Sequence, residues 1–155
     1  MIKSTTSNKL KKYTLTKVEQ LGHTRKDIFL FKNGICGFKN AKKFIIASLP
    51  QDTPEHYRYL QSTEDERLKL IMMNITVNPK DFSIINAKDL EISLHTKNLE
   101  LKDVAIFLVT SMHSKLGKNC ISVNTVAPIM LNPVSQEGWQ VILDSPAYNV
   151  QHYLG

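Results

Sequence analysis

The 155-residue sequence has few of the residues that mark specialised protein classes. Its two cysteines, Cys36 and Cys120, lie too far apart for the close spacing of a zinc site, and we expect reduced thiols rather than a disulfide. No apolar run approaches the roughly 20 residues that span a bilayer. The polar, basic residues 1–13 lack the apolar stretch of a secretory signal. A soluble cytoplasmic protein that does not enter a membrane is therefore expected.

The histidines and glycines are not arranged as metal ligands or as phosphate-binding loops. The five histidines include no pair at i, i+2 or i, i+4, so the sequence predicts no metal and no cofactor. The two glycine motifs, Gly34-x-x-Gly37 and Gly117-Lys118, lack the remaining positions of either nucleotide-binding fingerprint. Both motifs are interpreted as turns.

No set of residues at an informative spacing indicates an enzyme. The GxSxG elbow of hydrolases is absent, and the adjacent acids Glu64, Asp65 and Glu66 are typical of a solvated turn or helix start. Cys36 stays open as a nucleophile, which would require a histidine and a carboxylate to approach it in space. A binding protein without enzymatic activity is favoured.

The charge is strongly basic, at +6 with a pI near 9.3. Part of the excess lies in residues 1–12, which are expected to form a disordered tail before a single domain at 13–155. The lysines of this tail are Lys3, Lys9, Lys11 and Lys12. An RNA-binding small barrel is the alternative function, although no strand face interleaves aromatic and basic residues.

What the sequence does contain is a series of short β-rich runs separated by turn signals. The clearest is Leu90 to His95, where Leu90, Ile92 and Leu94 alternate with polar residues as in a strand with one wet face. The other runs are Tyr13–Val18, Ile28–Phe31, Lys43–Ser48, Tyr57–Ser62, Leu68–Val77, Val104–Met112, Ile121–Ala127 and Trp139–Leu143. About nine short strands are therefore predicted.

This spacing predicts an all-β fold, either a small antiparallel β-barrel or a barrel-like sandwich. At most one short helix is expected, near Thr63 to Leu68, where Ser62 or Thr63 would cap it. Trp139 and Tyr148 are expected to pack in the core or at its rim rather than to stack on bases.

The spaced residues also resemble the FliW family, the flagellar assembly factors of bacteria. Its early signature is phenylalanine, proline, any residue, glycine, isoleucine, proline, glycine and phenylalanine. The residues in register with it are Phe31, Gly34, Ile35, Gly37 and Phe38. Lys32 and Cys36 replace the two prolines, at a cost to the turn of about 0.4 to 1 kcal/mol per position.

Further landmarks follow in the family's order from about Tyr13 to Tyr153, and their joint order is specific. They are Tyr59-Leu60-Gln61-Ser62 followed by Glu64-Asp65, Asn78-Pro79, Val104 to Thr110, the group Asn124, Ala127, Pro128 and Ile129, and the closing Gly138, Gln140, Ile142 and Leu143.

The resemblance implies a minimal antiparallel β-barrel that binds proteins. Family members bind flagellin in the cytoplasm and also bind CsrA, an RNA-binding translational repressor, so that flagellin export frees FliW to antagonise CsrA allosterically. They are often acidic, which suits the basic surface of CsrA. Because this chain carries +6, we expect flagellin to be the primary partner and CsrA binding to be weak or lost.

Two sets of site residues are proposed from the sequence. The candidate partner-facing positions, which are polar or aromatic and near turns, are Tyr59, Gln61, Glu64 and Asn124. The alternative is that these residues only satisfy backbone groups in turns and at rims. The positions assigned to the fold are Gly34, Gly37 and Pro128.

Overall fold

The computed structural model describes residues 28–50, 53–54, 56–77 and 83–154. The expected tail at 1–12, the predicted strand Tyr13–Val18 and the Asn78-Pro79 landmark lie outside the described residues. The elements in chain order are β1 (Ile28–Leu30), β2 (Lys43–Ser48), β3 (Tyr57–Ser62), β4 (Lys69–Asn74), the helix α3 (Ala87–His95), the 3-10 turn η3 (Leu101–Asp103), β5 (Ala105–Lys115), β6 (Lys118–Val123), β7 (Ile129–Asn132), β8 (Glu137–Gln140) and β9 (His152–Leu154).

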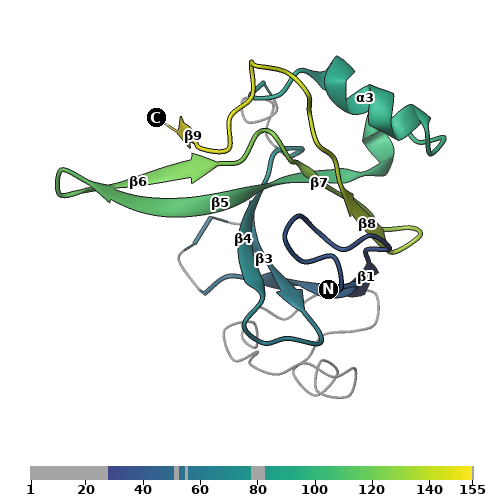
Figure 1. Cartoon of the computed structure of the whole chain (residues 1–155), viewed down its shortest axis with the longest axis horizontal. Helices are drawn as coiled ribbons and strands as arrows, with labels where there is room; N and C mark the ends of the chain where they lie inside the picture. Colours follow the sequence, from purple (N-terminus) through teal and green to yellow (C-terminus); the bar gives the residue numbers. More distant parts are fainter. Residues whose placement is uncertain (1–27, 51–52, 55, 78–82, 155) are drawn as a thin grey trace.

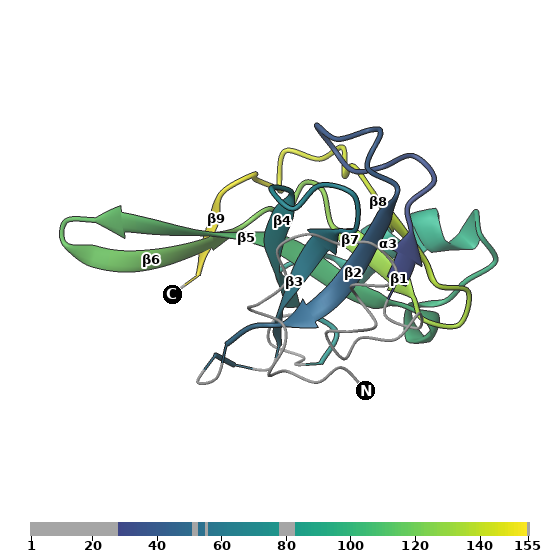
Figure 2. The same ribbon diagram turned by 90° about the horizontal axis from the view of Figure 1, so that it is seen from below.

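The strands form one sheet that closes on itself, as Figures 1 and 2 show. The strand order is β4-β3-β2-β1-β8-β7-β5-β6-β9, and an additional pairing of β4 with β5 completes a ring. The predicted all-β, barrel-like fold with at most one short helix is thus confirmed for the described residues, where α3 is the α-helix. One pairing departs from the antiparallel expectation, because β1 meets β8 in parallel through Leu30 and Glu137.

Two apolar clusters occupy the two faces of this ring. Successive residues of a strand point to opposite faces, so neighbours in sequence belong to different clusters. Met72 and Phe107 lie in one cluster with Phe31 and Phe44, whereas Met73 and Leu108 lie in the other. The second cluster is covered by α3 and takes in the partly buried Trp139 and Tyr148. Part of the ring is therefore buried on both faces.

The predicted strand at Leu90 to His95 is wrong, because these residues are the greater part of the helix α3. Leu90 and Leu94 are four residues apart and both fully buried, whereas Ile92 is 70% exposed. Residues four positions apart lie on the same face in a strand and also in a helix. Over so short a run, the alternation of apolar and polar residues therefore does not distinguish the two structures. The signal that identifies the helix is Asn86, whose side chain accepts the Lys88 N–H at 3.0 Å.

The predicted helix near Thr63 to Leu68 is also wrong, because these residues turn the chain from β3 into β4. Ser62 does act as a cap, but of a turn: its Oγ accepts the N–H groups of Glu64 and Asp65 at 3.1 Å each. A serine bonded to the next backbone donors is as typical of a turn as of a helix start.

The other strand predictions differ mainly at their ends. Those at Lys43–Ser48 and Tyr57–Ser62 coincide with β2 and β3. The run Ile121–Ala127 ends as a strand at Val123, because Asn124 begins a turn. The strand β7 was missed, since Pro128 and Asn132-Pro133 interrupt the apolar pattern on both sides of it.

Beyond Thr110, β5 and β6 leave the ring and project from the body as a long hairpin (Figures 1 and 2). Its tip is Leu116 and Gly117, which both have positive φ, at 51° and 76°. This geometry is that of a two-residue hairpin turn. No helix among the described residues is long and apolar enough to span a membrane.

Candidate partner-binding surface

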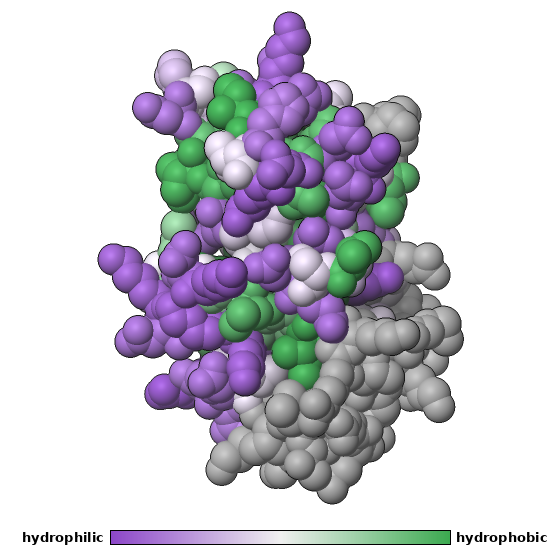
Figure 3. Space-filling view, turned by 90° about the vertical axis from the view of Figure 1, so that its right-hand side faces the viewer, coloured by the Kyte–Doolittle hydropathy of each residue, from purple (hydrophilic) through white to green (hydrophobic). Residues whose placement is uncertain are grey.

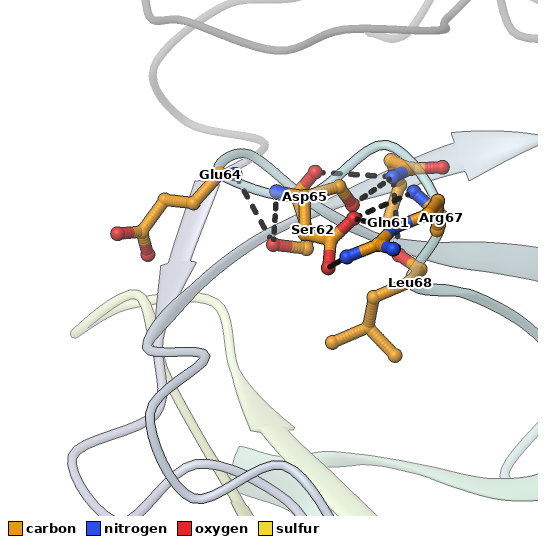
Figure 4. A network of polar contacts seen from close by, with 6 residues as sticks. All are labelled: Gln61, Ser62, Glu64, Asp65, Arg67 and Leu68. Atoms are coloured by element: carbon orange, nitrogen blue, oxygen red, sulfur yellow. Dashed lines mark hydrogen bonds and ion pairs between the residues drawn. The ribbon is translucent and has the colours of Figure 1, made fainter.

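The turn between β3 and β4 is built around the side chain of Gln61, as Figure 4 shows. The Gln61 Nε2 donates hydrogen bonds to the carbonyl oxygens of Ser62, Asp65 and Leu68 at 3.1, 3.3 and 3.0 Å. Ser62 secures the other half of the turn through the two amides that its Oγ accepts. A rigid turn with a defined outer surface results.

Gln61 is fully buried, at 0% exposure. Its amide nitrogen bonds only to the turn, and its Oε1 has no hydrogen-bond partner among the described residues. The structure therefore excludes Gln61 from a partner-facing surface, contrary to the expectation from sequence. Gln61 stabilises the turn between β3 and β4, because its two N–H donors are shared among three carbonyl groups of that turn.

The acidic residues of the turn point outward. Glu64 is exposed, and in Figure 4 its carboxylate extends away from the hydrogen-bonded network. Asp65 instead pairs with Arg67, whose Nε and Nη2 lie 3.2 and 3.3 Å from its carboxylate oxygens. The Arg67 side chain and backbone N–H hold the pKa of Asp65 below its ordinary value. Glu64 thus projects into solvent, and Glu66 of the same turn is exposed as well.

The loop from Phe31 to Phe38 lies beside this turn. Phe31 is fully buried and packs edge-on against Phe44 with ring centroids 5.1 Å apart. Gly34 has φ +64°, and a Cβ there would lie 2.4 Å from the carbonyl oxygen of Phe38. Gly37 has φ +84° with open space around it. Both positions require the left-handed conformation that glycine adopts without strain, and Gly34 also lacks room.

Gln140 ties this loop to two segments that are distant in sequence. Its Oε1 accepts the Cys36 N–H at 2.7 Å, and its Nε2 donates to the Ala127 carbonyl at 3.0 Å. Pro128, next along the chain, is buried. Three of the segments that carry the family resemblance therefore meet at the Gln140 amide, a contact that the sequence did not predict.

A shallow recess separates the loop from the β3–β4 turn. Its walls are Gly37, Phe38, Lys39, Asn40, Ala41, Ser62, Glu64, Asp65 and Leu68. Phe38 is 48% exposed although its backbone is fixed by a pair of hydrogen bonds with Ile35. The recess thus presents an exposed aromatic ring close to a free carboxylate, an arrangement suited to protein contacts. We call it the Phe38–Glu64 recess.

The two remaining candidate residues lie elsewhere on the sheet. Tyr59 is half-buried, with the Lys69 ammonium 4.0 Å from its ring centroid. Asn124 uses its Oδ1 to accept the N–H groups of Val126 and Ala127, at 3.0 and 3.2 Å. Tyr59 on β3 lies in one row of paired residues that crosses β4 and β5 and ends at Val123 on β6, next to Asn124. Three strand spacings, roughly 14 Å, therefore separate Tyr59 from the Asn124 turn. The four predicted residues do not form one cluster.

A second pocket, on the other side of the loop, has basic walls that sequence reasoning missed. It encloses about 240 Å³ and includes Lys32, Lys39, Lys97 and Glu137. Lys32 pairs with Glu137 at 3.4 Å, and the Lys97 ammonium lies 4.6 Å from the Trp139 ring centroid. Figure 3 shows this side of the molecule as mostly hydrophilic, with apolar residues in small separate groups.

Within the described ranges, no group of histidine, cysteine and acidic residues is placed to hold a metal ion. Cys36 and Cys120 are both free thiols. The loop side of the ring thus presents exposed aromatic, acidic and basic side chains, with Phe38, Glu64 and Lys39 among them.

Comparison with known proteins supports this description. A profile described as FliW protein matches residues 12–154. The flagellar assembly factor FliW of Clostridium novyi (strain NT) is 34% identical over 138 residues, which cover 85% of this chain and 88% of that protein. The FliW of Thermosipho africanus (strain TCF52B) is 30% identical over 143 residues, or 90% and 92% of the two chains.

The fold is also similar to a solved structure. The crystal structure of the flagellar assembly factor FliW superposes with a TM-score of 0.61 and 27% identity, covering 83% of this chain and 86% of that one. The family profile, the named relatives and the shared fold all extend over most of the chain. The chain therefore belongs to the FliW family.

Proposed function

We propose that this protein is a flagellar assembly factor that binds flagellin in the cytoplasm and antagonises the translational repressor CsrA, so that flagellin export is coupled to translation. The single observation that carries the proposal is the family match over residues 12–154. The protein acts through binding and not through catalysis, in keeping with a loop side that offers contact chemistry.

Within this function, the Phe38–Glu64 recess is the proposed flagellin contact. Exposed aromatic rings at the centre of a contact carry a large share of binding energy, and Phe38 is the aromatic residue of this recess. Glu64 projects beside it and would fix the orientation of a basic partner group. Tyr59 and Asn124 act as separate contributors, since the sheet holds them apart.

The distribution of charge refines the expectation for CsrA. Residues 1–27 hold seven of the 20 lysines and arginines and two of the 14 acids, so residues 28–155 carry a net charge of only +1. The like-charge repulsion of a basic partner therefore originates mainly in residues 1–27. We propose that CsrA binding is weaker than flagellin binding for this reason.

The first experiment is a calorimetric titration of the protein with flagellin from the same source, repeated with CsrA at the same salt concentration. Saturable one-to-one binding of flagellin, tighter than binding of CsrA, is expected. Equal submicromolar affinity for both partners would contradict the proposed preference. No heat and no co-elution with flagellin would show that the scaffold serves another partner.

Variants test the contact surface. Phe38→Ser and Glu64→Lys should each weaken flagellin binding about tenfold or more. Val134→Ser is the matched control, because Val134 is exposed and lies outside the recess. Equal affinity of all three variants would place the flagellin contact on another face. Steeply salt-dependent RNA binding by the unmodified protein would instead favour an RNA-binding barrel.

A further inference from the structure

The projecting hairpin has an open strand edge. We define the arm as residues 111–120, the part of β5 and β6 that lies outside the ring (Figures 1 and 2). The pairing of β5 with β4 ends at Thr110, whereas its pairing with β6 continues to Lys115. Among the described residues, β5 therefore has one strand neighbour from Ser111 to Lys115, and its other edge faces solvent.

The direction of the backbone groups on this edge follows from two hydrogen bonds at the base of the arm. The Val109 carbonyl accepts the Asn124 N–H on the β6 side, and the Ile106 carbonyl accepts the Ile75 N–H on the β4 side, both at 2.9 Å. In an antiparallel strand, successive residues direct their N–H and C=O groups to opposite sides. Met112 and Ser114 therefore present theirs to the open edge, which is a template for another strand.

The arm is exposed but held in place. Met112 is 66% exposed, and Leu116 at the tip is also exposed. An isolated two-stranded hairpin is marginally stable in water. Here the C-terminal strand β9 supports one face, because Tyr153 receives the Lys115 ammonium 4.0 Å from its ring centroid and lies 5.5 Å from the His113 ring. The open edge is thus pre-organised to receive a strand.

The charge of the arm is of one sign. Lys115 and Lys118 flank the turn and His113 lies nearby, while β5, β6 and β9 contain no aspartate or glutamate. This contrasts with residues 28–155 as a whole, whose net charge is close to neutral. A strand added to this edge would therefore be favoured when it carries acidic side chains.

We propose that the open edge of β5 from Ser111 to Lys115 binds an extended, acidic segment of a protein partner as an additional β-strand. Backbone hydrogen bonds from Met112 and Ser114 supply the affinity, and Lys115 and Lys118 supply the preference for acidic sequences. This surface is separate from the Phe38–Glu64 recess. Failure of the proposal would leave flagellin binding at the recess unaffected.

The probe is a short capped peptide of alternating glutamate and valine, and its counterpart of alternating lysine and valine is the charge control. Both are titrated into the full-length protein, and amide exchange is followed by NMR. The acidic peptide should slow exchange at Met112 and Ser114 by about tenfold or more, with no such effect from the lysine peptide. Protection elsewhere, or equal protection by both peptides, would overturn the proposal.

Ser114→Pro removes a donor from the open edge without removing a bond between β5 and β6. It should bind the acidic peptide at least about tenfold more weakly than the matched variant Ser114→Ala. The double variant Lys115→Glu, Lys118→Glu leaves the backbone intact and should reverse the preference to the lysine peptide. Lys118→Glu alone keeps Lys115 over the Tyr153 ring, and it should lower the preference for the acidic peptide even if Ser114→Pro disturbs that contact.

Three other results would overturn the proposal. Equal affinity of Ser114→Pro and Ser114→Ala would exclude strand addition. Binding of single-stranded RNA at the arm lysines, with no binding of the acidic peptide, would identify a nucleic acid as the anionic ligand. Concentration-dependent dimerisation that protects the Met112 and Ser114 amides would identify a second copy of this chain as the occupant.

Discussion

Gly138 on β8 is in direct contact with the ring of Phe31, because a Cβ added at Gly138 would lie 2.4 Å from both Cε1 and Cζ of that ring. Phe31 begins the loop that carries Gly34, Cys36 and Phe38, and its ring is fully buried against Phe44. The missing side chain at Gly138 therefore allows the loop to pack on β8. The position of the recess depends on this contact.

Gly138→Ala should destabilise the protein by about 1 to 3 kcal/mol, because the added methyl group must displace a buried ring. The measurement is the midpoint and slope of urea unfolding. The matched control is Val134→Ala, which alters an exposed residue of the turn that precedes β8. Unchanged stability of Gly138→Ala would show that Phe31 has room to move.

The two glycines of the loop should differ in their response to alanine. Gly37→Ala should cost about 1 kcal/mol, because its positive φ strains an L-residue while the surrounding space is open. Gly34→Ala should cost more, because its Cβ would also meet the backbone of Phe38 and Lys39 at 2.4 to 2.7 Å. Thermal unfolding of both variants checks the order, and a larger loss for Gly37→Ala would contradict it.

Gln61→Leu should destabilise the protein by about 1 to 3 kcal/mol, because buried carbonyl groups of the β3–β4 turn lose their donor. Flagellin binding should weaken only through the altered shape of the turn. Glu64→Gln, an exposed change in the same turn, is the control for stability and should stay within about 0.5 kcal/mol. An equally stable Gln61→Leu protein would mean that water replaces the amide.

Tyr148 makes stability depend on pH in the alkaline range. Its hydroxyl donates to Asp89 and accepts the Asn86 N–H, which fixes the C-terminal segment to the start of α3. Burial and the hydrogen bond to Asp89 raise the pKa of Tyr148 above its ordinary value. Its contribution should be complete below about pH 10 and lost as the pH rises through the folded-state pKa. Comparison with Tyr148→Phe isolates this term, and identical alkaline profiles would disprove it.

The four lysines within residues 1–12 should govern the affinity for CsrA. Replacing Lys3, Lys9, Lys11 and Lys12 with glutamine lowers the net charge from +6 to +2. Because like charges repel, CsrA binding should then tighten and depend less on salt, while flagellin binding at the recess should be unchanged. Titrations at two salt concentrations test this. Weaker CsrA binding by the substituted protein would mean that the lysines make attractive contacts.

The sequence alone was sufficient for the all-β, barrel-like class and for the family. Short β-rich runs between turn signals identified the class, and the spaced glycines and polar residues identified the family, because both patterns reflect local backbone needs. The bounds of β2 and β3 were likewise readable, since turn signals flank both of these strands. The local pattern gave a wrong prediction at Leu90 to His95, because the spacing of the two buried leucines is compatible with both a strand and a helix.

Only the tertiary structure decided which of the candidate residues are exposed. Gln61 and Glu64 are both polar residues near one turn. In the fold, Gln61 is fully buried and bonds to three carbonyl groups, whereas Glu64 is exposed to solvent. Closure of the ring, the meeting of three segments at Gln140, and the open edge of β5 depend equally on pairings between distant residues. A sequence specifies local preferences directly, whereas exposure results from where the whole chain places each side chain.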